Sequence, residues 1–367
     1  MSRSIDPARP VRVGLIGCGN VSGHYLHNLG VPDLLEVVAC ADAQPERAEA
    51  TARAFGIPRT PRVAELLDSD DIDLVLNLTN PAGHAEVSLG AIAAGKHVYT
   101  EKPLAGSVAE ADAILAAADE RGVHVGCAPD TFLGPGPRRC AELLAEDVIG
   151  TPVSANAFLM SAGPEAFHPA PEFLYQPGAG PLMDSGPYGV SALVALLGPV
   201  TAVTGMSTRG RSTRSVLTGE RTGSSFPVDV PTHVTALLRF ERGAVATLVM
   251  SFDVHGTRTP RLEVHGTGGS MICPSPNSWG GPVWIRPAGS AGFDEVRIDG
   301  GEGNRIGMGV IEMATALRSG RAPAASGLLG RHVLEVLEGI QESDHRGGTA
   351  IPIRPVRDLV LEGGHRA

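Results

Sequence analysis

The sequence has few aromatic side chains, few cysteines and no long apolar run. Phe, Trp and Tyr together make up 4% of the 367 residues. The longest apolar runs fall well short of the roughly twenty residues that a membrane-spanning helix needs. The first ten residues are polar and lack the apolar core of a signal peptide. We therefore expect neither a membrane span nor a membrane partner.

The cysteines have no spacing that is typical of a disulfide framework or a metal site. They stand alone, without a CxxC pair or a His/Cys ligand pattern, as Cys18, Cys40, Cys127, Cys140 and Cys273. An odd number of isolated cysteines favours reduced, mostly buried thiols in a cytoplasmic protein, and we expect no metal. The net charge of −10 argues against nucleic acid as a partner.

Glycine and proline, in contrast, are abundant, with 47 and 29 residues. Hydrophobic residues make up 43% and charged residues 19% of the chain, which is typical of a globular protein. The length is sufficient for two domains rather than one. The composition therefore suits a turn-rich α/β protein of two domains.

The first 128 residues alternate between strand and helix patterns. Buried-strand patterns cover 11–16, 35–41, 73–78, 97–100 and 123–127, with a weak strand near Arg59 and Thr60. Helical patterns follow at 20–29, 45–55, 63–67, 84–94 and 108–121. Such repetition predicts a Rossmann-type α/β domain over residues 1–128, built on a doubly wound parallel sheet.

From residue 129 to 367 the pattern changes to that of an α+β domain. Short alternating strands such as 233–240 and 244–251 predict an open, mainly antiparallel sheet. Helices are expected at 137–146, 187–197, 311–317 and 330–343. Residues 130–137 are the expected hinge, and 205–226 the expected mobile surface loop. An open alternative is that the last helix packs back on the first domain.

A glycine-rich turn follows the first predicted strand. Gly17 and Gly19 occupy the first two glycine positions of a dinucleotide turn, and Ser22 takes the third. Asn20 and Val21 then begin a helix, whose N-terminal amides and dipole favour the pyrophosphate of a bound dinucleotide. The placement between a strand and a helix makes this prediction much stronger than the glycines alone.

Asp42 ends the second predicted strand, where a carboxylate accepts hydrogen bonds from the ribose hydroxyls of a dinucleotide. Its charge repels a 2′-phosphate, and the next two residues offer no arginine. We therefore expect NAD as the cofactor rather than NADP, although Arg47 lies one helical turn away.

Thr79, Asn80 and His84 follow the fourth predicted strand, on the side of the sheet edge expected to bind the nicotinamide. Thr79 and Asn80 offer hydrogen bonds to the cofactor. For His84 two interpretations stay open, a contact to the cofactor and a packing residue at the start of a helix.

Glu101, Lys102 and Pro103 follow the next strand at the same edge. A lysine in a cleft beside a cationic nicotinamide would have a lowered pKa, because the two positive charges compete and water is excluded. Its amine could then exchange a proton with an alcohol that gives up hydride. Pro103 is a candidate for a cis peptide bond that turns Lys102 toward the substrate. By composition alone, however, a solvent-exposed ion pair is the simpler interpretation.

The order of these motifs resembles the Gfo/Idh/MocA family, named after glucose–fructose oxidoreductase and inositol dehydrogenase. The likeness rests on Val-Gly-Leu-Ile-Gly-Cys-Gly at 13–19, Thr79-Asn80-Pro81 with His84, Gly95-Lys96-His97-Val98, Glu101-Lys102-Pro103, and the later Asp184-Ser185-Gly186 and His265-Gly266-Thr267. It implies NAD(P)-dependent chemistry on sugars, cyclitols and related polyols. It also implies that the second domain's open sheet mediates oligomerisation, so we expect a homodimer or homotetramer.

The chain departs from the family pattern at two positions of a motif that matters for catalysis. The family usually has Asp-x-Gly-x-His, followed by a second Asp three residues on, whereas Tyr188 stands here in the histidine position and Ser191 in that of the second Asp. The resemblance implies that Tyr188 is the catalytic partner of Lys102, since a phenol beside an ammonium can relay a proton. Asp184 is expected to orient the substrate or the lysine, and both are expected to contact the substrate.

His168 and Tyr175 are the remaining substrate candidates. They belong to the segment 167–178, which the resemblance places at the mouth of the cleft. Stacking rings and histidine donors suit a sugar ring. We also expect Glu101 and Lys102 to contact the cofactor.

These observations predict an NAD-dependent oxidoreductase that passes hydride between nicotinamide and a hydroxyl or keto carbon of a sugar, glycoside or cyclitol. Two alternatives stay open: a redox-neutral glycoside hydrolase that uses bound NAD transiently, and a non-enzymatic NAD(H)-binding sensor. The sequence does not indicate which sugar or carbon reacts, or in which direction.

Overall fold

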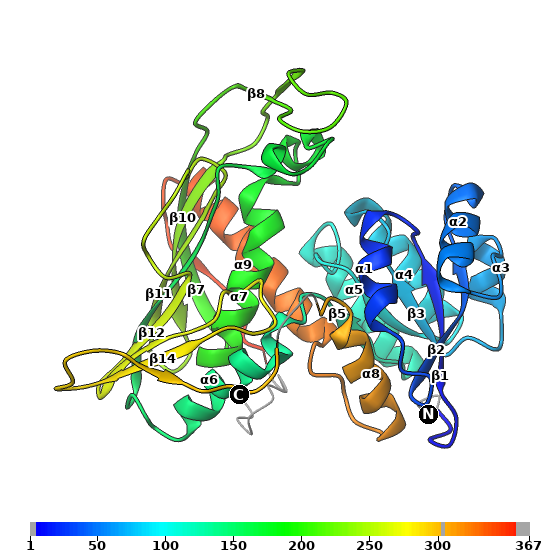
Figure 1. The fold of residues 1–367 in the computed structure, drawn as a ribbon, viewed down its shortest axis with the longest axis horizontal. Coiled ribbons are helices and arrows are strands. Elements are labelled where there is room, and N and C mark those ends of the chain that lie inside the picture. The colour runs from blue at the N-terminus through cyan, green and yellow to red at the C-terminus, as the bar shows by residue number, and fades with distance from the viewer. Residues whose placement is uncertain (1–4, 302–304, 357–367) are drawn as a thin grey trace. The chain divides into compact units, whose positions relative to one another are not determined.

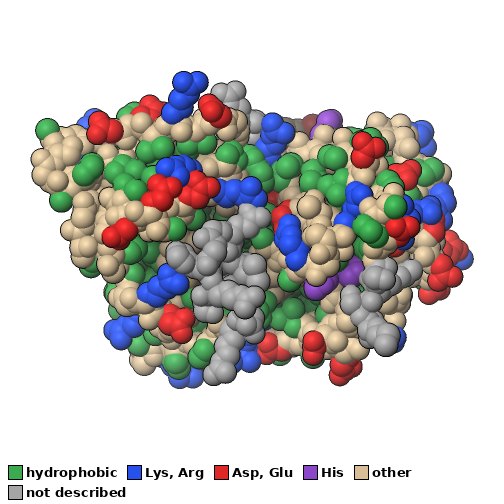
Figure 2. All heavy atoms as spheres, turned by 90° about the horizontal axis from the view of Figure 1, so that it is seen from below, with side chains coloured by type: hydrophobic (Ala, Val, Ile, Leu, Met, Phe, Trp, Pro, Cys, Tyr) green, Lys and Arg blue, Asp and Glu red, His purple; other side chains and the backbone are tan. Residues whose placement is uncertain are grey.

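The computed structural model describes residues 5–301 and 305–356 and divides into two compact units (Figure 1). Of these residues, the first unit contains those up to Leu133 and those from 305 to 334, and the second unit contains the rest. Segment 305–334, which we assigned to the second domain, therefore belongs with the first unit. Acidic, basic and apolar side chains are intermingled on the face that Figure 2 shows.

The first unit is built on a parallel sheet of five strands in the order β2-β1-β3-β4-β5. The strands are β1 (Val11–Ile16), β2 (Leu35–Ala41), β3 (Leu74–Asn77), β4 (His97–Thr100) and β5 (Val125–Cys127). The helices between them are α1 (Asn20–Asn28), α2 (Pro45–Phe55), α3 (Val63–Asp68), α4 (His84–Ala93) and α5 (Val108–Arg121), with a short 3-10 turn η1 (Pro81–Gly83) before α4. The doubly wound parallel sheet is confirmed.

The carboxyl ends of these strands lie in one row across the sheet. Ile16 pairs with Ala41 on one side and Asn77 on the other, Asn77 pairs with Thr100, and Thr100 pairs with Cys127. The segments that follow these residues therefore leave the sheet at the same edge. This register brings the glycine turn, Asp42, Thr79 and Lys102 to a common edge, as the sequence predicted.

The weak strand predicted near Arg59 and Thr60 does not form. The backbone there makes one hydrogen bond to β2, from the Cys40 amide to the Arg59 carbonyl at 3.0 Å. Pro58 and Pro61 flank the segment and have no amide hydrogen to donate. The two prolines therefore prevent a sixth strand.

The edge strand β5 is covered by a segment from much later in the chain. The Cys127 amide donates to the Ala325 carbonyl at 2.9 Å, and Gly126 forms a β-bridge with Ser326. This segment joins α8 (Met308–Arg318) to α9 (Gly327–His345), and the division between the two units falls inside α9. Covering the edge protects backbone groups that would otherwise be open to another strand.

The second unit contains a sheet of nine strands in the order β15-β14-β13-β12-β6-β11-β10-β7-β16. All neighbours are antiparallel except β6 and β11. The strands are β6 (Pro152–Met160), β7 (Val200–Thr208), β10 (His233–Phe240), β11 (Val245–Ser251), β12 (Leu262–Gly266), β13 (Gly269–Ile272), β14 (Val283–Pro287), β15 (Asp294–Val296) and β16 (Ile351–Pro352). The predicted open, mainly antiparallel sheet is confirmed.

Helices cover one face of this sheet. They include α6 (Pro135–Ala145) and α7 (Gly180–Leu197), which lies beside the sheet in Figure 1. Two short 3-10 turns, η3 (Pro164–Ala166) and η4 (Glu172–Tyr175), also belong to this unit, whereas η2 (Thr131–Leu133) belongs to the first. A Cβ at Gly189 would lie 2.9 Å from Leu159 and 3.0 Å from Leu248, so α7 packs closely on the sheet.

Two expectations for this unit are wrong. Helix α7 begins at Gly180 instead of residue 187, with Pro187 inside it. Pro187 removes one helical hydrogen bond, but the close packing of α7 outweighs this loss. Residues 205–226 are not a plain surface loop, because they contain the end of β7 and a hairpin of β8 (Thr213–Ser215) and β9 (Ser225–Pro227), with Arg214 buried.

Candidate active site

The glycine turn after β1 has the backbone that a dinucleotide site requires. Gly17 has a φ of +101°, and a Cβ there would lie 2.5 Å from the carbonyl carbon of Leu78. At Gly19, by contrast, a Cβ would meet no atom of the described chain within 4 Å. Asn20 begins α1, and no described side chain caps that helix. Its first amides are therefore available to a phosphate, and the residues present fit a bound dinucleotide.

Asp42 is held in place by backbone amides at this turn. Its carboxylate accepts hydrogen bonds from the amides of Cys18 and Gln44, each at 2.8 Å. The side chain is half-buried. The carboxylate is thus fixed beside the glycine turn, where the ribose of a dinucleotide would lie.

The segment after β3 is organised by Asn77, which no sequence motif marks. The Asn77 amide side chain accepts from the Thr79 hydroxyl at 2.7 Å and donates to the His84 carbonyl at 3.1 Å. Asn80 is exposed and accepts from the Gly83 amide at 3.1 Å, which caps the turn before α4. Thr79 is half-buried at the sheet edge, where the sequence predicted it.

Lys102 follows β4 and is half-buried. The peptide bond between Lys102 and Pro103 is cis, as the sequence suggested, and so is the bond between Ala128 and Pro129. The Glu101 carboxylate accepts the Lys102 amide at 2.9 Å and the Tyr25 hydroxyl at 2.7 Å. Tyr25 comes from α1, so a residue of the first helix contacts the motif after the fourth strand.

His84 is buried, with an exposed fraction of 1%. Its ring nitrogens face two carbonyl oxygens, that of Pro103 at 2.6 Å and that of Thr79 at 3.0 Å. Both nitrogens thus face backbone oxygens of the chain itself. Of the two interpretations that the sequence left open, these contacts favour the packing one over a contact to the cofactor.

A second carboxylate, Asp130, is buried close to this motif. It accepts the Gly309 amide at the start of α8 at 2.6 Å. Burial raises the pKa of Asp130 to about 6, the negative charge of Glu101 acts in the same direction, and the amide hydrogen bonds oppose both. The Tyr99 hydroxyl is also buried, and no described atom pairs with it. Its pKa is raised well above the usual value, by burial first and by Asp130 second.

The predicted catalytic residues of the second unit lie on α7. Asp184 and Tyr188 are four residues apart, so they share one face of the helix, and both are half-buried. Ser191, in the position of the family's second Asp, is buried with an exposed fraction of 2%. Because α7 begins at Gly180 and not at residue 187, the helix carries Asp184 as well as Tyr188.

Tyr175 is fully buried in the second unit, with its hydroxyl donated to Glu165. Burial and this bond raise the pKa of Tyr175. Arg214 pairs with Glu165 and with Asp253 in the same buried network. These contacts argue against a direct contact between Tyr175 and a substrate.

His168, the other substrate candidate, is half-buried on the segment before α7. Its ring packs edge-on against Phe173, with 5.3 Å between the ring centres. Phe173 and the neighbouring Phe167 are exposed by 54% and 74%. These rings form an accessible aromatic surface next to His168.

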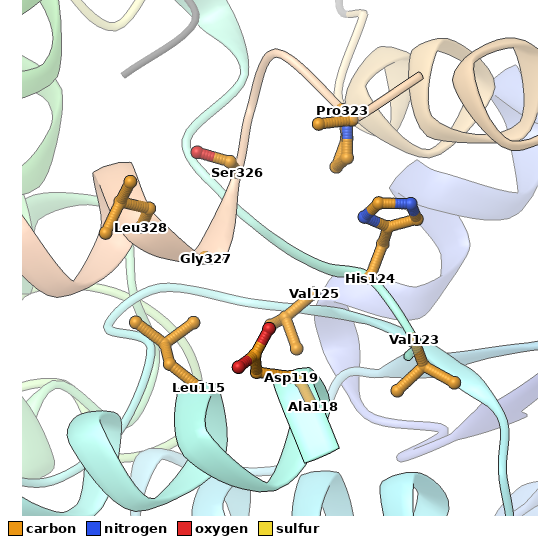
Figure 3. Close-up of a pocket in the computed structure, with 11 residues that line it drawn as sticks. Leu115, Ala118, Asp119, Val123, His124, Val125, Pro323, Ser326, Gly327 and Leu328 are labelled. Atoms are coloured by element: carbon orange, nitrogen blue, oxygen red, sulfur yellow. The ribbon is translucent and has the colours of Figure 1, made fainter. Parts of the chain in front are cut away.

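Figure 3 shows a pocket in the first unit. It has a volume of about 230 Å³ and lies between the end of α5, β5 and the start of α9. Its lining includes Asp119, His124 and Ser326, and none of the predicted site residues.

The searched part of the chain, 5–301 and 305–356, has no cluster of three or more His, Cys, Asp or Glu side chains placed to bind a metal. It also has no helix long and apolar enough to cross a membrane.

Comparison with known proteins places this geometry in a family. Residues 11–128 match the profile of the Gfo/Idh/MocA oxidoreductase family with an NAD-binding Rossmann fold, and residues 138–272 match the C-terminal domain of that family. The chain is 31% identical to dTDP-3,4-didehydro-2,6-dideoxy-alpha-D-glucose 3-reductase of Actinomadura kijaniata, over 77% of each chain. It is 28% identical to levoglucosan dehydrogenase of Pseudarthrobacter phenanthrenivorans, over 71% of this chain and 73% of that one.

Solved structures agree on the fold. An NAD-binding oxidoreductase from Klebsiella pneumoniae superimposes with a TM-score of 0.82 at 23% identity, over 95% of this chain and all of that one. Levoglucosan dehydrogenase in complex with NADH superimposes with a TM-score of 0.81 at 24% identity, over 94% of this chain and all of that one. From the two family profiles and the Actinomadura relative, the chain belongs to the Gfo/Idh/MocA family of NAD-binding oxidoreductases.

Proposed function

We propose that the protein transfers hydride between NAD and a hydroxyl or keto carbon of a sugar, glycoside or cyclitol. The observation that carries this proposal is the row of strand ends, which brings the glycine turn, Asp42 and Lys102 to one edge of the sheet. The names of the relatives support the substrate class, since they include a reductase of a dTDP-sugar, levoglucosan dehydrogenase and 1,5-anhydro-D-fructose reductase.

The cofactor-binding residues follow from the sheet edge. Gly17, Gly19 and the α1 amides of Asn20 and Val21 would bind the pyrophosphate, and Asp42 the adenosine ribose, which favours NAD over NADP. Thr79, Asn80, Glu101 and Lys102 would line the nicotinamide side. His84 would act through the chain instead of touching the cofactor.

Bound NAD would accept the hydride in oxidation and supply it in reduction. The Lys102 amine, in its neutral form, takes the proton of the substrate hydroxyl as the C–H bond breaks, and returns it in the reverse direction. Tyr188 shares that proton through its phenol, and the Asp184 carboxylate accepts a hydrogen bond that orients the substrate or the lysine. Lys102, Tyr188 and Asp184 are thus the proposed catalytic residues.

We assign the substrate's sugar ring to Asp184, Tyr188 and His168. The exposed rings of Phe167 and Phe173 beside His168 provide the aromatic surface on which a sugar ring can stack. Tyr175 supports this segment from inside the unit through its bond to Glu165.

We also propose that the open face of the nine-stranded sheet joins copies of this chain into a homodimer or homotetramer. Met206 and Leu237 on this face are exposed by 62% and 50%, and Val245 by 41%. Exposed apolar side chains on an open sheet face favour burial against a second copy. Replacing Leu237 with Glu should shift the protein to the monomer in analytical ultracentrifugation. An unchanged mass for that variant would contradict this interface.

The cysteines of the described chain are all free and buried, which supports a reducing, cytoplasmic compartment.

To test the function, the protein is incubated with NAD and each member of a panel of sugars, polyols and glycosides. NADH formation is measured by its absorbance, and the release of aglycone from the glycosides is measured in parallel. We expect NADH formation on at least one polyol or sugar. Aglycone release without net NADH would indicate the redox-neutral hydrolase, and tight NAD binding without any turnover would indicate the sensor.

Two variants then test the role of the lysine. Lys102→Met removes the amine, and Lys102→Arg keeps the positive charge but does not lose its proton near neutral pH. Both should bind NAD and lose turnover. Full turnover by either variant would contradict Lys102 as the proton acceptor.

A further inference from the structure

The main chain on the N-terminal side of Lys102 is fixed by a carboxylate. The Lys102 amide donates to one oxygen of Glu101 at 2.9 Å, and the other oxygen accepts the Tyr25 hydroxyl at 2.7 Å. Tyr25 has an exposed fraction of 1%. Burial and the charge of Glu101 raise its pKa well above the usual value, so the hydroxyl keeps its proton and remains a donor. Both oxygens of Glu101 are therefore engaged in holding this backbone.

The main chain on the C-terminal side of Lys102 is fixed by a histidine. His84 Nδ1 lies 2.6 Å from the carbonyl oxygen of Pro103, the residue next to Lys102. The other ring nitrogen lies 3.0 Å from the carbonyl oxygen of Thr79. His84, at the start of α4, thus connects the segment after β3 to the segment after β4 through the contact between its ring and Pro103.

The backbone of His84 is itself anchored on the sheet. Asn77, the last residue of β3, donates its side-chain amide to the His84 carbonyl at 3.1 Å and to the Ser88 hydroxyl at 3.2 Å. All three residues are buried. The backbone of His84 is thus held by the last residue of β3, and its ring contacts the segment after β4. The ring is therefore a rigid support for Pro103.

The protonation of the ring indicates which of its two contacts is the hydrogen bond. Burial lowers the pKa of His84 and the charge of Lys102 acts the same way, whereas Glu101 and the carbonyls of Pro103 and Thr79 oppose this. A lowered pKa leaves a neutral ring with one N–H at pH 7. The shorter contact, to Pro103, assigns that proton to Nδ1.

We propose that His84 and Tyr25 are positioning residues that together hold Lys102 in its reactive place, one through the Pro103 carbonyl and the other through Glu101. This rests on the proposed role of Lys102 as the proton acceptor. Neither residue touches the reacting atoms. Each acts by fixing the backbone from which the lysine side chain extends, so that the amine reaches the substrate hydroxyl without a search of conformations.

The size of the expected effect follows from the sensitivity of proton transfer to distance. Misplacing a catalytic group by about 1 Å can lower the rate by about a hundredfold. Losing one of the two supports should therefore lower kcat by about tenfold or more, with a smaller change in KM.

The histidine offers a matched pair of conservative variants. The amide nitrogen of an asparagine takes roughly the place of Nδ1, and that of a glutamine the place of Nε2. His84→Asn should keep the bond to Pro103 and stay within about threefold of the wild-type kcat, whereas His84→Gln should lose about tenfold or more. His97→Gln is the control, because His97 is a buried histidine at the opposite end of β4 whose Nδ1 accepts the His124 amide at 2.9 Å. It should leave kcat unchanged.

A direct readout of the lysine separates positioning from simple loss of stability. The lysines of the chain are Lys96 and Lys102, so protein with ¹³C-labelled lysine gives two sets of NMR signals, which Lys102→Met assigns. His84→Gln should shift the signal and the pKa of Lys102 and the pH profile of kcat, and His84→Asn should restore them. Tyr25→Phe should lower kcat by about tenfold through the other support, and keeps the test decisive if a histidine variant does not fold.

The variants distinguish a wrong positioning role for His84 and Tyr25 from a wrong catalytic role for Lys102. If Lys102→Met loses turnover while the His84→Gln and Tyr25→Phe proteins keep wild-type kcat and pH profiles, the positioning role is refuted and the function stands. If His84→Asn is as impaired as His84→Gln, the path through Pro103 is refuted. If Lys102→Met keeps full turnover, the function itself fails.

Discussion

The buried carboxyl group of Asp130 contributes to the free energy of unfolding, and this contribution should fall as the pH rises from acidic to neutral. The carboxyl group has an exposed fraction of 5%, and burial raises its pKa from 3.8 to about 6. A group whose pKa is raised by folding stabilises the folded state fully below its unfolded pKa, and this stability is lost as the pH rises through the folded value. The relevant window for Asp130 is therefore about pH 4 to 6.

The magnitude follows from the shift. A rise of about 2 in the pKa of Asp130 corresponds to about 3 kcal/mol of unfolding free energy, of which about 2 kcal/mol is lost between pH 4.5 and 7.5. Asp130→Asn removes the titration, and its side-chain oxygen can still accept the Gly309 amide. The variant should therefore lack this loss.

A buried histidine of the same unit acts in the opposite direction. His332 has an exposed fraction of 0%, and burial, assisted by Arg331, lowers its pKa from 6.5 to about 4. Protonation favours the unfolded chain, so His332 destabilises the fold as the pH falls from 6.5 to 4, by about 3 kcal/mol in full. In the wild type the two contributions nearly cancel.

The assay is urea unfolding of the NAD-free protein at pH 4.5, 6 and 7.5. Unfolding is monitored through the hydrogen exchange of peptides from the five-stranded sheet. Relative to the wild type, Asp130→Asn should gain about 2 kcal/mol of stability from pH 4.5 to 7.5, and His332→Gln should lose a similar amount over the same range. Equal pH dependence of all three proteins would refute the assignment of buried, titrating groups at these positions.

Further predictions concern single contacts. Gly17→Ala should lower the melting temperature and NAD affinity together, because its Cβ would meet Leu78, whereas Gly19→Ala should lower NAD affinity alone, as differential scanning fluorimetry and NAD titration would reveal. Asp42→Ser should weaken NAD binding about tenfold and narrow the preference for NAD over NADP, measured as the ratio of dissociation constants. Arg214→Met should destabilise the second unit by about 3 to 5 kcal/mol in urea unfolding, because Glu165 keeps a buried charge, and Arg214→Met with Glu165→Gln should lose less.

Much of the fold could be predicted from local patterns. The buried strands of the first unit and the glycine turn are contiguous in sequence, so hydrophobic runs and turn residues mark them directly. The start of helix α7 was predicted wrongly, because packing against residues distant in the chain decided it, whereas the weak strand at Arg59 was predicted wrongly although two prolines stand beside it in the sequence. Close packing keeps Pro187 inside a helix, and Pro58 and Pro61 prevent a strand.

The candidate site divides in the same way. Lys102, Asp42 and Gly17 belong to motifs that the sequence shows, and their common edge follows from parallel strands. Tyr25 and Asp130 were missed because their partners, Glu101 and Gly309, lie 76 and 179 residues away in the chain. No local pattern marks such pairs. The burial of Tyr175 likewise depends on Glu165 and Arg214, which only the folded second unit brings together.

The central claim is that Lys102 accepts and returns the substrate proton, and the titration of its amine tests this most directly. In ¹³C-lysine-labelled protein, the Lys102 signal can be followed against pH with and without saturating NAD. We expect that in the NAD complex this amine titrates well below the ordinary lysine pKa of about 10.4, in step with the pH dependence of kcat. A Lys102 amine that titrates near the ordinary value in the NAD complex, while turnover proceeds at neutral pH, would contradict it.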